Sequence, residues 1–163
     1  MIGVRLKWVA LGALVAGALD LAFALSFAAW NGTAPLRLLQ TVASGAFGKA
    51  AFEGGTPLAG AGLALHFGLS LLWALAFLWA ARWRPVLARH PLASGVAFGV
   101  VVFLAMRLVV LPLSAFPFAV SFKPLASALD LLSHALLFGV PIALATRAAL
   151  APAMPSRQST PPP

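Results

Sequence analysis

Residues 8–29, WVALGALVAGALDLAFALSFAA, form an apolar run that is interrupted by one acidic side chain, Asp20. Similar runs follow at about 57–80, 92–115 and 125–147. Each run has about the ~20 residues that a helix needs to cross a hydrocarbon core of ~30 Å. The sequence therefore predicts an all-α fold, namely an integral membrane four-helix bundle.

The composition excludes an ordinary soluble domain, because 62% of the 163 residues are hydrophobic and only 9% are charged. Four spans leave little chain for anything else, so residues 1–150 are expected to form a single transmembrane domain with short connections. Residues 151–163 are rich in proline and lack apolar periodicity, which predicts a disordered cytoplasmic tail. The absence of cysteine excludes disulfides, thiolate metal sites and cysteine nucleophiles.

Basic residues predict the orientation of the spans. Positive charge is concentrated in the segments on one side of the predicted bundle, and this side is expected to be cytoplasmic. Both termini of this multi-pass protein are then expected on the cytoplasmic side of the membrane. A cleaved signal peptide is the competing interpretation of the N-terminus, but the first run is longer than a usual signal core and contains an acidic residue. The residues on the predicted inner side are Arg5, Lys7, Arg82, Arg84, Arg89, Arg147 and Arg157.

The segment 34–50, in the first outer loop, has the periodicity of an amphipathic helix. Thr33 is expected to cap it and Pro35 fits its first turn. Such a helix lies in the membrane interface, although it could also act as a lid over an outward-facing cavity. Its apolar stripe is Leu36, Leu39, Ala43, Ala46, Phe47 and Ala50, and its polar positions include Arg37, Gln40, Thr41 and Ser44.

Five ionisable side chains lie inside the apolar runs, where an isolated charge is costly and commonly functional. A rise of ~1.5 Å per residue places all five in one layer in the outer half of the bundle. Arg107 is expected within reach of Asp20 or Asp130, with either histidine as a hydrogen-bond partner. The five candidates for ligand binding or proton relay are Asp20, His66, Arg107, Asp130 and His134.

Small residues accompany these side chains and predict close contacts between helices. Gly95 and Gly99 lie below Arg107 and could pack either within the chain or between copies in a homo-oligomer. Pro112 and Pro141 are expected to kink the third and fourth spans or to end their regular hydrogen bonding.

Several functions fit this layer. It could be a structural network that fixes helix register, or the centre of small-solute or proton-linked transport or binding. Haem held by His66 and His134 is a lesser alternative, and a metal site is disfavoured because Arg107 would repel a cation. Hydrolase and metalloprotease motifs are absent, so no catalytic residue and no enzyme are expected. The basic residues form no phosphate-binding face, so nucleic acid is not an expected partner, whereas the lipid bilayer is.

Short motifs spread along the four runs also resemble those of a family of small four-span bacterial inner-membrane proteins of uncharacterised role. The resemblance covers most of residues 10–147 and implies a helical bundle, without implying a reaction. It draws attention to Asp20, Arg37, Gln40, His66 and His134 as polar positions of the family, whereas the position of Arg107 usually holds an uncharged polar residue there. The motifs are AGALD at 16–20, APLRLLQ at 34–40, ASG at 43–45, AFEGG at 51–55, LHF at 65–67, VLPLS at 110–114, and His134 with GVPIAL at 139–144.

Overall fold

The computed structural model describes residues 5–151, and this part of the chain contains helices and no strand. The predicted tail at 152–163 lies outside the described residues. The helices are α1 (Leu6–Trp30), α2 (Pro35–Phe47), the 3-10 helix η1 (Gly48–Phe52), α3 (Gly55–Trp83), α4 (Val86–Arg89), α5 (Pro91–Ala105), the π-helix η2 (Met106–Val110), α6 (Leu111–Leu113), α7 (Pro124–Leu132), the π-helix η3 (Ser133–Gly139) and α8 (Val140–Leu150).

Four helices are long and apolar enough to span a membrane, which confirms the predicted fold class. The first two are α1 and α3. The third is the continuous rod α5–η2–α6 (Pro91–Leu113), and the fourth is α7–η3–α8 (Pro124–Leu150). Each bound lies within three residues of its predicted position.

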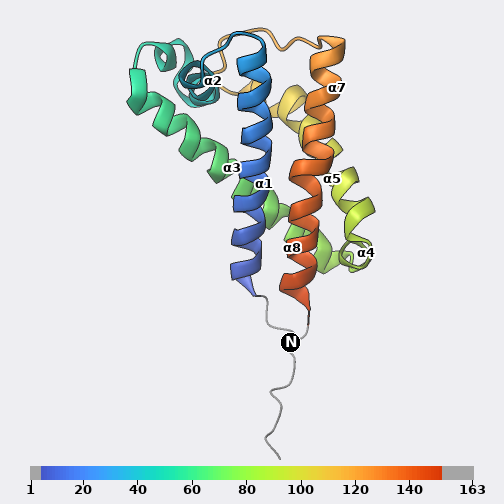
Figure 1. Ribbon diagram of the computed structural model, residues 1–163. Coiled ribbons are helices and arrows are strands. Elements are labelled where there is room, and N and C mark those ends of the chain that lie inside the picture. Colours follow the sequence, from blue (N-terminus) through green and yellow to red (C-terminus); the bar gives the residue numbers. More distant parts are fainter. Residues whose placement is uncertain (1–4, 152–163) are drawn as a thin grey trace, which may run out of the picture.

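The spans form a bundle in which α1 lies between α3 and the fourth span (Figure 1). Helix α3 crosses obliquely, and α2 lies at the end of the bundle opposite the start of α1 and the end of α8 (Figure 1). The Arg5 guanidinium donates to the carbonyl oxygen of Ala148 at 2.7 Å, so a cation caps the C-terminus of α8. The start of α1 and the end of α8 are therefore on the same side of the bundle, which we call the inner side.

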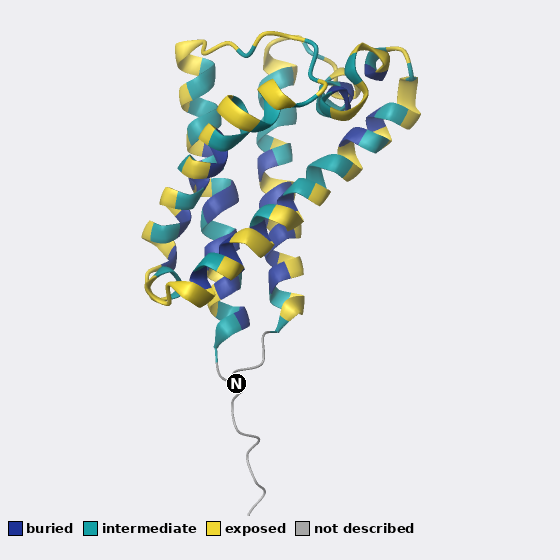
Figure 2. Cartoon of the chain, turned by 180° about the vertical axis from the view of Figure 1, so that it is seen from behind, coloured by how far each residue is buried: buried dark blue, intermediate teal, exposed yellow. Residues whose placement is uncertain are grey.

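Burial divides each span into a face toward the bundle and a face away from it (Figure 2). The bundle interior toward the inner side is an apolar core that includes Val9, Phe77 and Ile142, each at most 2% exposed. Large apolar side chains such as Leu72, Val101 and Leu136 are exposed instead. In water such surfaces would be unstable, so these faces contact lipid.

Glycines set the closest approach between the third and fourth spans. A Cβ atom placed on Gly99 would collide with the backbone of His134 and Ala135, and one on Gly95 would collide with Gly139. Such contacts exist because glycine lets two helix backbones touch. Gly95 and Gly99 therefore pack within the chain, so they are not available for a contact between two copies.

The third and fourth spans each contain a π-helical segment just before an internal proline. In the third span, the Leu111 amide donates to the carbonyl of Met106, five residues earlier, and Pro112 follows immediately. In the fourth span, η3 ends two residues before Pro141. Proline has no amide hydrogen and its ring displaces the carbonyl four residues earlier, so a wider turn relieves the clash. The predicted interruptions are thus π-helices, and they contain Arg107 and His134.

Helix α2 begins as predicted at Pro35, but Thr33 does not cap it, because its N-cap is Ala34 and no side chain bonds there. Burial in α2 does not follow the division into polar and apolar faces. Gln40, Ala43 and Ser44 are buried, whereas Leu36 and Phe47 are exposed. The backbone of α2 touches α3 at Gly62, and small side chains such as Ala43 and Ser44 fit beside such a contact whatever their polarity, while Gln40 is buried with its amide bonded to the carbonyl oxygen of Gly55.

Candidate functional site

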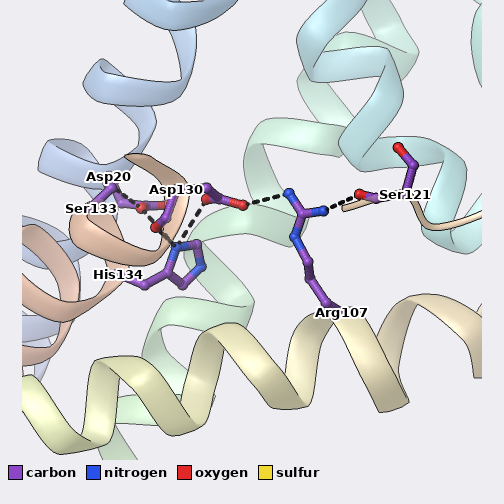
Figure 3. Close-up of polar contacts among 6 residues, drawn as sticks. All are labelled: Asp20, Arg107, Ser121, Asp130, Ser133 and His134. Atoms are coloured by element: carbon purple, nitrogen blue, oxygen red, sulfur yellow. Dashed lines mark hydrogen bonds and ion pairs between the residues drawn. The ribbon is translucent and has the colours of Figure 1, made fainter. Parts of the chain in front are cut away.

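Three spans contribute to a cluster of polar side chains in the half of the bundle away from the inner side (Figure 3). Asp20 on α1 is 8% exposed and accepts a hydrogen bond from the Ser133 hydroxyl at 2.9 Å. Nδ1 of His134 lies 3.1 Å from Oδ1 of Asp130 and 3.7 Å from Oδ1 of Asp20. One imidazole therefore stands between two carboxylates.

Arg107 extends this cluster toward the outer loop (Figure 3). Its Nη2 donates to Oδ2 of Asp130 at 2.9 Å, and its Nη1 donates to the carbonyl oxygen of Ser121 at 2.7 Å. The guanidinium also lies 5.3 Å from the ring centre of Phe103 and 5.4 Å from that of Phe122, which adds cation–π attraction. The ion pair thus ties η2 to α7 and to the loop between α6 and α7.

The cluster contains two carboxylates, one guanidinium and one histidine. With His134 neutral its formal charge is negative, so one added proton or one bound cation would neutralise it. An uncompensated negative charge is costly in the low dielectric of the bundle, so the cluster favours binding a proton or a cation.

His66 is on α3 and is not directly bonded to the cluster. Its Nε2 lies 2.8 Å from the carbonyl oxygen of Gly17, one turn below Asp20 on α1. A carbonyl only accepts, so Nε2 carries the hydrogen, and in the neutral ring Nδ1 is left as an acceptor. For His134 the same logic puts the hydrogen on Nδ1, which faces the carbonyl oxygen of Asp130 at 3.0 Å.

Three cavities surround these residues. The outer cavity has a volume of about 320 Å³ and is lined by Arg107, Asp130 and His134, with Phe116 and Ser121 from the outer loop. The central void, of about 50 Å³, is lined by Asp20, both histidines, Ser70 and Trp73. The lateral cavity, of about 400 Å³, is mainly apolar and lies between α2, α3 and the η2–α6 segment. Met106 lines all three.

The two histidines line a common space, the central void of about 50 Å³, in which water-sized molecules have room. Across residues 5–151, no group of three or more histidine, aspartate and glutamate side chains has the arrangement of a metal site.

The structure brings together four of the five residues of the predicted layer, and places His66 beside the central void that Asp20 and His134 also line. The polar residues of α2 are elsewhere. Arg37 stacks 4.0 Å from the ring centre of Phe52, Gln40 donates to the carbonyl of Gly55 and Ser44 bonds within its own helix.

Sequence reasoning did not include Ser133 and Ser121 in the site. Ser133 is 3% exposed and adjoins His134 in sequence, and this position next to a site residue is the signal that could have identified it. Ser121 contributes only a backbone carbonyl, and for this no side-chain signal exists.

The fold and the exposed apolar surface define the chain as a multi-pass helical membrane protein with a polar cluster inside the bundle. No protein-family model, no curated protein and no solved structure matches it.

Proposed function

We propose that the protein is a small-solute or proton-linked binding or transport component of a membrane, and that Arg107, Asp130, His134 and Asp20 form its site. One observation carries this proposal: the charged cluster lines an open cavity of about 320 Å³ instead of being sealed. The side chains of Arg107 and Asp130 remain 20% and 31% exposed. This volume is in the ~300–1,000 Å³ range of small-molecule sites.

The asymmetry of the bundle supports the same function. Cavities and polar groups lie in the half away from the inner side, whereas the inner side is filled by the apolar core around Phe77, Phe138 and Ile142. Such a bundle receives a proton or solute from one side and holds it at Asp20 and His134. Passage to the other side then requires the core to repack, as in alternating access.

The proposal extends to the setting of the protein. The concentration of Arg and Lys on the inner side supports cytoplasmic termini, and the resemblance of the motifs supports a bacterial inner membrane and that family of four-span proteins. We further propose a non-enzymatic role, and a homo-oligomer as a natural partner, because four spans enclose little space for a pathway.

A proton flux measurement tests the proposal directly. The purified protein is reconstituted in liposomes that contain a pH-sensitive dye, and a pH step is applied with and without a membrane potential. The Asp20→Asn variant is expected to reduce the flux to that of protein-free liposomes, because an amide does not exchange a proton at this position.

The chain offers a matched control in Glu53, which is its one acidic residue besides Asp20 and Asp130 and is exposed between η1 and α3. Glu53→Gln removes the same charge outside the cluster and is expected to leave the flux unchanged. The competing function is a purely structural network. It predicts that Asp20→Asn lowers the thermal stability while wild-type protein and both variants conduct no more than empty liposomes, and that result would overturn the proposal.

A further inference from the structure

The central void is the junction between His66 and the charged cluster. It lies among α1, α3, η2 and η3, and Asp20, His66 and His134 all line it. No hydrogen bond among the described residues links His66 to the two other side chains. The void therefore separates His66 from the charged cluster, although an imidazole could hydrogen-bond with the side chains of that cluster.

Two of the residues that line this void carry buried hydrogen-bond donors without a partner. Ser70 is 1% exposed and its hydroxyl has no hydrogen-bond partner among the described residues. The indole nitrogen of Trp73, one turn further along α3, is likewise buried and unpaired. Buried donors are rarely left without an acceptor, so each of these groups indicates a missing oxygen in the space between them.

The side chains that line the void determine which kind of molecule could supply that oxygen. The Trp73 N–H only donates, so it cannot coordinate a cation, and the Asp20 carboxylate repels an anion. A ligand that accepts from Trp73 and Ser70 and also donates, to Asp20 or to Nδ1 of His66, satisfies every group. Water does this, and the volume of about 50 Å³ accommodates it.

We propose that the central void is a hydration site, in which bound water accepts from Ser70 and Trp73 and joins His66 to Asp20 and His134. The five ionisable residues of the spans then belong to one hydrogen-bonded network. The water site itself rests on the burial and pairing of these groups. Its use as a second exit for a proton held at Asp20 rests on the proposed function.

The shape of the void depends on Gly17. A Cβ atom at this position would lie 2.7 Å from the Ser70 hydroxyl and 3.0 Å from the ring of Phe67. Glycine thus lets α1 and α3 approach closely beside the void, and a side chain at this position would displace the Ser70 hydroxyl or the Phe67 ring.

Water in the void can be detected through the indole N–H of Trp73. The protein is labelled with ¹⁵N at its tryptophans, embedded in lipid nanodiscs, and examined by NMR for magnetisation transfer from water, with NOE and ROE signs separating bound water from hydrogen exchange. Trp73→Phe assigns the signal. We expect a bound-water cross-peak at Trp73 that is weakened in Ser70→Ala. Its absence at Trp73 would overturn the proposal.

Trp8 provides a matched control, because its indole nitrogen is also buried and unpaired but does not line the central void. Thermal unfolding gives an independent readout. If the void holds water, Ser70→Ala removes a satisfied donor and leaves the melting temperature equal or lower. If the void is dry, Ser70→Ala removes an unsatisfied donor and raises the melting temperature, and that result would also refute the hydration site, whatever the proton flux shows.

Discussion

Gly99→Ala is expected to have the largest effect of any single methyl group added to this protein. The new Cβ would overlap the carbonyl of His134 and the Cα atom of Ala135, which are backbone atoms that no rotamer change can remove. The third and fourth spans must then separate. Because overpacking commonly costs ~1–3 kcal/mol even where side chains can adjust, we expect a loss of about 3 kcal/mol or more in the free energy of unfolding.

The same substitution at Gly68 is the matched control, since a Cβ there meets nothing within 4 Å and the residue lies within α3. Gly68→Ala should change the stability by less than about 1 kcal/mol, and in the favourable direction, because alanine is the better helix former. Thermal unfolding in one detergent and the monodisperse fraction after purification measure both variants. Equal behaviour of Gly99→Ala and Gly68→Ala would show that the two backbones are not in contact at this point.

Asp130→Asn is expected to have the second largest effect. It leaves the Arg107 guanidinium without its anionic partner and His134 with one carboxylate in place of two. Removing one member of a fully buried ion pair costs ~3–5 kcal/mol, whereas an exposed pair contributes ~0–1 kcal/mol. With 20% and 31% of the two side chains exposed, we expect about 2 kcal/mol.

A double-mutant cycle isolates the ion pair from other effects. Arg107→Leu also loses the bond to the Ser121 carbonyl, so its single effect alone does not measure the ion pair. The double variant should be more stable than the sum of the single effects implies, by about 1 kcal/mol or more. Arg37→Leu removes an exposed cation of α2 and should be nearly neutral. Additivity of Arg107→Leu and Asp130→Asn would contradict the pairing.

The spans and their approximate bounds followed from the sequence because hydropathy over ~20 residues is a strong signal. The common depth of Asp20, Arg107, Asp130 and His134 followed from helical rise alone. The choice of partner did not, because two carboxylates lie at similar depth and helix rotation decides which one Arg107 meets.

Other features could not be anticipated for identifiable physical reasons. Polarity did not predict which residues of α2 are buried, because the close contact with Gly62 favours small side chains, as at Ala43 and Ser44. The prolines indicated an interruption but not its form, because a π-turn, a kink and a helix end are all ways to accommodate a missing amide. Ser70 and Trp73 resembled ordinary packing residues until their unpaired donors were seen beside the central void.

The two π-helical segments also determine how the protein tolerates changes in chain length. A π-turn accommodates one extra residue while the helix on either side keeps its direction and facing. In a regular membrane span, deleting one residue rotates everything beyond it by about 100° and destroys the packing. In η2 or η3, such a deletion would instead restore a regular α-helix and leave both flanks in place. What it would displace is Arg107 or His134, and the regular helix would again meet the ring of Pro112 or Pro141, so shortening either span costs both the polar cluster and the wider turn that accommodates the proline.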